Sequence, residues 1–206
     1  ISYIDFALEL FNVEVNHRNK QNLTKRLRYA KLPASHDLNQ WQEIPLGGLA
    51  RQQLSQLREC IWLEQHFNII LMGPSGTGKT FIAAGLCADA LEKGYKACFR
   101  TMEQLIYLIK MKDVTKTAAK EYATLLNANL LVIDDIMMFP IERKQSVSLF
   151  NLIDHLHQKA SIIVTTNKSP DEWVKVLDDE VLAAAILDRL LFKCEVIKLT
   201  GKSYRL

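Results

Sequence analysis

The sequence lacks the features that mark disulfide-rich, zinc-binding or membrane-spanning proteins. Its four cysteines, Cys60, Cys87, Cys98 and Cys194, form no Cys-x-x-Cys pair and have no ligand partner at metal spacing. This argues against a disulfide scaffold and a zinc site, and it favours a reduced, cytoplasmic protein. No apolar run approaches the roughly 20 residues needed to cross a bilayer, and no signal peptide is visible, so no membrane partner is expected. The chain begins at Ile1 without a methionine, and we therefore expect it to be a fragment or a trimmed product.

What is present is the composition of an ordinary globular protein. The chain has 206 residues, of which 49% are apolar and 24% are charged. This length suits one domain with at most an appendage, and it can bury a substantial core without covalent cross-links. Disorder is excluded as the dominant state because the apolar fraction is too high.

The basic residues are unevenly distributed, although the net charge of +3 is too small to indicate a partner. Residues 16–32 contain six basic residues and no acid, and residues 96–120 contain six more against two acids. Two separated basic segments suggest a polyanionic partner, although solvated helix faces would show the same pattern. The basic residues are Arg18, Lys20, Lys25, Arg26, Arg28 and Lys31 in the first segment, and Lys96, Arg100, Lys110, Lys112, Lys116 and Lys120 in the second.

The first part of the chain shows the apolar spacing of a helix. Ile4, Leu8, Phe11 and Val15 recur at intervals of three and four residues, and the pattern continues through the first basic segment. Pro33 should stop this helix, because the residue before a proline is disfavoured in the α conformation.

Residues 33–48 contain two prolines and two glycines and are the expected connector. We predict a helical, basic segment at residues 1–45 and a second domain at residues 46–206. In the second domain, helices alternate with short apolar strands, which predicts an α/β fold with a five-stranded parallel sheet covered on both faces. The expected strands are residues 68–72, 97–99, 130–133, 161–165 and 194–199, and the expected helices are residues 50–65, 79–93, 102–112, 143–158, 171–177 and 181–191.

The most specific motif is Gly73-Pro74-Ser75-Gly76-Thr77-Gly78-Lys79-Thr80, which matches the phosphate loop Gly-x-x-x-x-Gly-Lys-Ser/Thr. Glycines let the backbone N–H groups point inward at phosphate oxygens, and the following helix N-terminus favours the same anion. Lys79 can reach the β- and γ-phosphates of ATP, and the Thr80 hydroxyl can ligate Mg²⁺. A chance glycine-rich turn is the alternative, but this motif stands between an expected strand and an expected helix, as a phosphate loop requires.

A second motif places two acids at the end of an expected strand. The apolar residues 130–133 are followed by Asp134 and Asp135. A parallel strand beside the phosphate-loop strand would bring Asp134 to the magnesium ion. Asp135 could orient or deprotonate an attacking water. The alternative is a pair of acids that cap the next loop.

Three further polar residues are candidates on weaker grounds. Asn167 ends the triplet Thr165-Thr166-Asn167, where its amide could hold the attacking water, although asparagine after a strand is ordinarily a turn residue. Arg189 lies at the end of an expected helix, and Arg205 lies just past the last expected strand. Both arginines are also compatible with an ordinary solvated surface.

The order of these motifs resembles that of AAA+ ATPases. Within that class, residues 46–206 resemble IstB, the ATP-binding helper of insertion-sequence transposition, whose family is related to the helicase loader DnaC. The resemblance is most specific in the last 35 residues. It rests there on Glu172-Trp173, on residues 179–191 with Asp188-Arg189-Leu190, on Cys194-Glu195-Val196-Ile197 and on Ser203-Tyr204-Arg205-Leu206.

The resemblance implies a role for each polar candidate. Asn167 would be the sensor-1 residue, Arg189 the arginine finger of a neighbouring subunit's ATP site, and Arg205 the sensor-2 arginine. It also implies ATP-bridged rings or helical filaments on duplex DNA, which present the target to a transposase and stimulate it. The DNA-contacting residues would be Arg18, Lys20, Lys25, Arg26, Arg28 and Lys31, together with Lys110, Lys112 and Lys116 after the second strand.

The sequence departs from the family pattern at two places. Asp135 stands where the family usually carries Glu, and one methylene less withdraws the carboxylate by on the order of 1.5 Å. We therefore expect slower hydrolysis with nucleotide binding intact. The chain also ends soon after the last expected strand, which implies a minimal C-terminal lid.

Two other functions remain open on the sequence. A DnaC-like loader would dock on a replicative helicase through the first 45 residues, with ATP as its switch, although residues 179–191 favour transposition. A small-molecule phosphotransferase could use the same phosphate loop, but the stretch after Pro170 offers neither a clear lid nor a clear substrate insert.

Overall fold

The computed structural model describes residues 2–40, 48–177 and 179–200. Its core is a five-stranded parallel sheet, which confirms the predicted α/β class. The order across the sheet is β2-β3-β4-β1-β5, and because all neighbours are parallel, the carboxyl ends of the strands meet at one edge. The strands are β1 (Asn68–Met72), β2 (Ala97–Thr101), β3 (Leu130–Asp134), β4 (Ser161–Thr166) and β5 (Cys194–Lys198).

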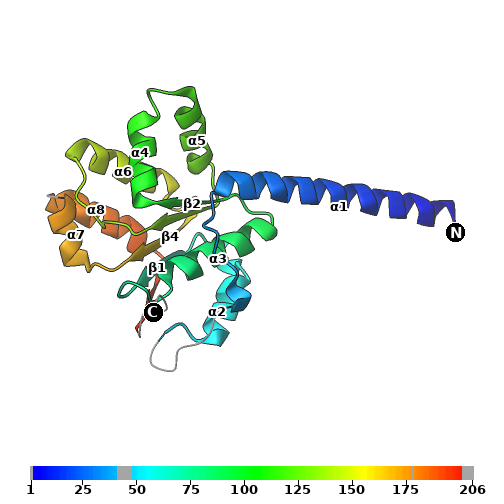
Figure 1. Cartoon of the computed structure of the whole chain (residues 1–206), viewed down its shortest axis with the longest axis horizontal. Helices are drawn as coiled ribbons and strands as arrows, with labels where there is room; N and C mark the ends of the chain where they lie inside the picture. Colours follow the sequence, from blue (N-terminus) through cyan, green and yellow to red (C-terminus); the bar gives the residue numbers. More distant parts are fainter. Residues whose placement is uncertain (1, 41–47, 178, 201–206) are drawn as a thin grey trace.

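Helices cover both faces of this sheet (Figure 1). Successive strand residues point to opposite faces, so each face has its own core. Leu131 and Ile133 pack among residues of α4 to α8, whereas Leu130 and Val132 pack among residues of α2 and α3. The helices are α1 (Tyr3–Ala30), α2 (Arg51–Arg58), α3 (Lys79–Glu92), α4 (Met102–Met111), α5 (Lys116–Leu126), α6 (Arg143–Leu156), α7 (Pro170–Leu177) and α8 (Glu180–Leu191).

Two helices differ from the expectation. The helix expected at residues 50–65 ends at Arg58, because Cys60 is left-handed at φ 61° and the chain turns back. The Trp62 indole N–H holds this turn by donating to the Leu57 carbonyl at 2.8 Å. Helix α5 is absent from the expectation, although Thr115 caps it by accepting a hydrogen bond from the Ala118 N–H at 3.2 Å.

Helix α1 is 28 residues long and projects from the body of the molecule (Figure 1). Its first half exposes large apolar side chains, such as Tyr3 at 95% and Phe11 at 70%. Only its last residue, Ala30, is fully buried. The helix ends before Pro33, as expected, with Lys31 in the left-handed conformation.

A buried guanidinium group anchors this end of α1. Arg100 of β2 is 1% exposed, and it donates to the carbonyls of Ala30 at 2.8 Å and Tyr29 at 3.2 Å. Its Nε donates to the Glu121 carboxylate at 2.9 Å, which also accepts from the Lys31 amine at 2.7 Å. The assignment of Arg100 to a polyanion-binding segment is therefore wrong, because its charge is used inside the fold.

The chain after α1 also packs on the body. Leu38 is buried against α3, where a Cβ on Gly85 would lie 2.2 Å from the Leu38 Cγ. Only glycine permits this approach, so the start of the expected connector is part of the folded core. Residues 41–47 of the connector lie outside the described residues.

Candidate nucleotide-binding site

The glycine-rich loop lies between the carboxyl end of β1 and the first turn of α3. Gly76 and Gly78 have φ values of 84° and 88°, which L side chains rarely adopt. At Gly73, a Cβ would lie 2.2 Å from the Leu199 carbonyl oxygen, so this position requires glycine for a different reason. The loop therefore has the backbone shape that the sequence motif predicts.

Lys79 is 6% exposed and extends along the loop. Its ammonium donates to the carbonyls of Gly73 and Pro74, each at 2.8 Å. The Thr77 hydroxyl donates to the same Pro74 carbonyl at 2.9 Å. The cation is thus held inside the loop, where a phosphate group would be bound.

Strand β4 separates β3 from β1, which corrects one sequence-based expectation. Asp134 does not arrive from a strand beside the phosphate-loop strand. It reaches the loop across β4, where its Oδ1 accepts hydrogen bonds from the Thr165 hydroxyl at 2.6 Å and the Thr80 hydroxyl at 3.0 Å. The carboxylate at the end of β3, which lies two strands away from β1, therefore contacts the first turn of α3.

Burial raises the pKa of the Asp134 carboxyl above its ordinary value. The hydrogen bond from Thr165 acts in the opposite direction, and the neighbouring charge of Asp135 adds to the rise. The group is 4% exposed, so its charged form depends on the two hydroxyl donors and on nearby cations.

Asp135 lies just outside this buried cluster. It is exposed and left-handed at φ 54°. Its backbone N–H donates to the Thr165 hydroxyl at 2.9 Å. The same hydroxyl therefore orients the Asp134 carboxylate and holds the backbone of Asp135, a role for Thr165 that the sequence motifs did not predict. The available signal was a threonine that directly follows three apolar residues near the carboxyl end of a buried strand.

Asn167 directly follows β4 and is exposed. The residue before it, Thr166, accepts a hydrogen bond at its carbonyl from the Gly73 N–H at 3.2 Å. Asn167 is therefore held next to the first residue of the phosphate loop.

Arg189 lies far from the loop of its own chain. Its carbonyl accepts a hydrogen bond from the Asn68 side-chain amide at 3.3 Å, at the amino end of β1. The phosphate loop begins at the other end of that strand, about 13 Å away at the usual rise of a β-strand. The guanidinium pairs with Asp154 at 2.9 Å and Asp188 at 2.7 Å. Arg205 lies outside the described residues.

The basic candidates for DNA contact differ in their surroundings. Arg18 pairs with Glu14 at 2.6 Å, and Lys110 lies 3.6 Å from Glu142. The Lys112 ammonium lies 4.6 Å above the Tyr122 ring. Arg26 and Lys31 bond to the body of the molecule, Arg26 through the Gly94 carbonyl at 2.9 Å and Lys31 through Glu121. Lys20, Lys25, Arg28 and Lys116 have no carboxylate partner within the described part of the chain.

The oxygen atoms of Thr80 and Asp134 suit a magnesium ion. Both are hard donors, and they lie 3.0 Å apart at the mouth of the loop. No cluster of three or more His, Cys, Asp or Glu side chains that could hold a metal occurs in residues 2–40, 48–177 and 179–200. Magnesium commonly takes one or two protein ligands and completes its shell with phosphates and water.

A phosphate loop after a central strand, with a carboxylate reaching it across the neighbouring strand, defines a P-loop protein of the AAA+ class. Solved structures share this fold. The DnaC helicase loader aligns with a TM-score of 0.66 at 20% identity, covering 84% of this chain and 99% of that chain. The replication initiator DnaA bound to AMPPCP and single-stranded DNA aligns with a TM-score of 0.66 at 16% identity, covering 84% of this chain and 52% of that chain.

The family model described as IstB-like ATP binding protein matches residues 1–206, and the chain belongs to this family. An IS21-like insertion-sequence ATP-binding protein of Bacteroides fragilis is 41% identical over 206 residues, covering 100% of this chain and 78% of that protein. The IS21 ATP-binding protein of Pseudomonas aeruginosa is 32% identical with the same coverage. These matches confirm the resemblance drawn from the sequence, including ATP as the expected ligand. Within the described residues, no helix is both long and apolar enough to span a membrane.

Proposed function

We propose that this chain is a magnesium-dependent ATPase that assembles on duplex DNA and serves insertion-sequence transposition by presenting target DNA to a transposase. The observation that carries the proposal is the hydrogen-bonded group of Thr80, Asp134 and Thr165 at the mouth of the phosphate loop. Its chemistry is that of a magnesium–triphosphate site. The family membership supplies the insertion-sequence context.

Different groups in and beside the loop would bind different parts of magnesium–ATP. The backbone N–H groups of residues 73–80 and the Lys79 ammonium would bind the phosphate oxygens. Thr80 and Asp134 would hold Mg²⁺, which supplies positive charge against the β- and γ-phosphates. Because Thr165 donates to Asp134 from the side of the sheet, it keeps that carboxylate aimed at Thr80.

Asp135 and Asn167 would act on the attacking water. Asp135 is exposed beside the buried cluster, and its backbone is held by Thr165, so its carboxylate can accept a proton from water. Asn167 is tied to the start of the loop through the contact between Thr166 and Gly73, so its amide can orient the same water. The shorter side chain of Asp135, compared with glutamate, favours slow turnover of an ATP-bound assembly.

Arg189 would complete the site of a neighbouring copy. Its position at the opposite end of β1 from the loop removes it from the ATP site of its own chain. In an assembly of identical protomers, Arg189 of one protomer would reach the phosphate loop of its neighbour. ATP would then bridge the interface between the two protomers. Hydrolysis would remove the γ-phosphate contact and loosen the assembly on DNA.

Two variants test this proposal. Lys79→Ala should weaken ATP binding about a hundredfold, because it removes a charge-assisted contact to phosphate. Arg189→Ala should leave ATP binding intact, abolish ATP-dependent assembly and lower hydrolysis about a thousandfold. Binding of a fluorescent ATP analogue, light scattering with duplex DNA, and phosphate release measure the three effects. Arg51→Ala, at an exposed arginine of α2, is the matched control and should change none of them.

Normal assembly of the Arg189 variant would contradict the arginine-finger role. The helicase-loader and phosphotransferase alternatives are tested in the same preparations. Capture of a hexameric helicase instead of a transposase would favour a loader. ATP turnover that requires a metabolite and ignores DNA would favour a phosphotransferase.

A further inference from the structure

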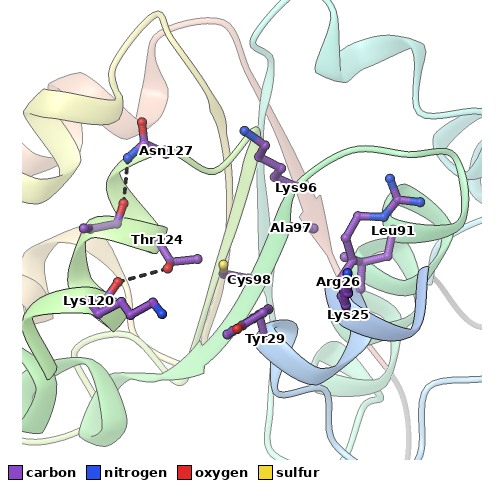
Figure 2. Close-up of a pocket in the computed structure, with 11 residues that line it drawn as sticks. Lys25, Arg26, Tyr29, Leu91, Lys96, Ala97, Cys98, Lys120, Thr124 and Asn127 are labelled. Atoms are coloured by element: carbon purple, nitrogen blue, oxygen red, sulfur yellow. Dashed lines mark hydrogen bonds between the residues drawn. The ribbon is translucent and has the colours of Figure 1, made fainter. Parts of the chain in front are cut away.

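A cavity of about 430 Å³ lies at the base of α1, between that helix, the start of β2 and α5 (Figure 2). Figure 2 shows residues of α5 on one side and residues of α1 and α3 on the other, with Tyr29 and Cys98 between them. None of residues 73–80 lines this cavity, so it is separate from the phosphate loop. Its volume falls within the usual range of small-molecule sites, about 300–1,000 Å³.

The cavity brings together the two basic segments that are separate in the sequence. Lys25 and Arg26 come from the first segment, Lys96 and Lys120 from the second, and no acidic residue is among those that line the cavity. Within the described part of the chain, none of the three lysines has a carboxylate partner. Four like charges around one cavity repel one another, and a bound anion would relieve that repulsion.

Arg26 adds a donor that needs an acceptor. Its Nη1 donates to the Gly94 carbonyl at 2.9 Å, but its Nε is buried and has no hydrogen-bond partner in the described structure. A buried donor without an acceptor is unfavourable, so a rotation of the Arg26 side chain that offers this donor to an anion oxygen in the cavity would be favoured.

The remaining walls are apolar. Leu91, Ala97, Cys98 and Ala123 line the cavity, and Tyr29 beside them is 55% exposed. Inorganic phosphate would leave these walls without contacts. The cavity therefore suits a ligand that carries both a phosphate and a flat apolar group, and an aromatic ring at the mouth offers a stacking partner.

We propose that this cavity is a second nucleotide site, which takes the phosphate and the unpaired base of a nucleotide unit, from a DNA strand or as a free nucleotide. If the nucleotide belongs to a DNA strand, the inference rests on the proposed DNA-binding function and deepens it. Bases inside an intact duplex are stacked on both faces, so only an unpaired base can occupy the apolar walls. The cavity would therefore distinguish distorted or single-stranded DNA from a regular duplex.

The test compares three probes by fluorescence anisotropy, with the phosphate loop saturated by a non-hydrolysable ATP analogue. Two of these are labelled DNA, a single strand of about 12 nucleotides and its paired duplex. The third is unlabelled dAMP, which is added as a competitor. The wild type should bind both DNA forms, and the cavity should contribute about tenfold to the affinity for the single strand alone. Lys96→Gln/Lys120→Gln and Tyr29→Leu should each lose about tenfold in single-strand affinity. Lys159→Gln/Lys175→Gln removes the same charge from exposed positions outside the cavity and should keep the wild-type affinity for the single strand.

Displacement of the strand by dAMP would assign the site to free nucleotides, and retention of the strand would assign it to DNA. Equal losses in the cavity variant and the control variant would overturn the proposal, because general charge attraction would then explain the binding. The proposal would also be overturned if Tyr29→Leu bound each of the two DNA forms with the affinity of the wild type. Binding of fluorescent ATP, measured on each variant, keeps a failure of the phosphate loop distinguishable from a failure of this cavity.

Discussion

At the end of β4, the hydroxyl group of Thr165 lies between the two acidic residues of the site. It donates to the Asp134 carboxylate at 2.6 Å and accepts from the Asp135 N–H at 2.9 Å. One buried hydroxyl thus sets the direction of the magnesium-binding acid and the backbone position of the acid that follows. Valine has nearly the same shape but can make neither bond, so it separates the effect of the hydroxyl from the effect of packing.

We expect Thr165→Val to lower the free energy of unfolding by about 1–3 kcal/mol, because a buried carboxylate loses a donor. It should also weaken magnesium-dependent ATP binding, since the pKa of Asp134 rises further when that hydrogen bond is lost. Thermal unfolding and titration of a fluorescent ATP analogue at fixed magnesium measure the two effects. Thr165→Ser retains the hydroxyl and should bind ATP like the wild type, and equal ATP affinity in the valine variant would refute this role.

At the scale of elements, the structure attaches a long helix to the body through its last turn. Arg100 and Glu121 form an ion pair beneath the end of α1, with Lys31 as a second partner of the carboxylate. Burial raises the pKa of the Glu121 carboxyl, but the hydrogen bond from Lys31 and the charge of Arg100 outweigh it, and the net pKa lies below the ordinary 4.5. The ionised form of Glu121 is therefore the one that holds α1 in place.

A carboxyl with a lowered pKa stabilises the fold above its unfolded pKa, and that stability is lost as the pH falls through the folded value. We therefore expect the melting temperature to fall between about pH 5 and pH 3, and to fall less in Glu121→Gln than in the wild type. At pH 7, Glu121→Gln should be less stable by on the order of 2 kcal/mol. Calorimetry across this pH range checks both effects.

Glu103→Gln, at an exposed acid of α4, serves as the control and should follow the wild-type curve. Identical pH curves for Glu121→Gln and the wild type would show that the anchor does not depend on this carboxylate.

At the scale of the whole molecule, basic residues that are neighbours in sequence serve different purposes. Lys31 is used inside the fold through Glu121, whereas Lys20 and Arg28 are exposed on α1 without a carboxylate partner among the described residues. A count of charges along the chain cannot separate these two groups. Their effects on DNA binding should differ, since only unpaired cations release counterions from the phosphate backbone.

We expect the affinity for duplex DNA to fall steeply between about 50 and 200 mM salt. Lys20→Gln/Arg28→Gln should reduce the slope of log affinity against log salt by about 2, because two phosphate contacts are removed. Lys31→Gln should change the melting temperature more than the slope. Anisotropy titrations over a salt series measure the slopes, and a salt-independent affinity in the wild type would count against DNA contact by the basic residues.

The sequence by itself determined the local features of this protein. The phosphate loop from Gly73 to Thr80 depends on glycine and lysine at fixed spacing, and the apolar runs before it and at residues 130–133 depend on β-sheet preference and burial. Such features could be predicted because they rest on interactions between residues close in the chain.

Tertiary structure alone decided which distant residues meet. The position of β4 between β1 and β3 made Thr165 the residue that orients Asp134, although the sequence suggested direct neighbours. Burial under α1 turned Arg100 from a surface charge into an anchor. Strand order and helix docking arise from packing over the whole molecule. They cannot be read from the spacing of residues along the chain.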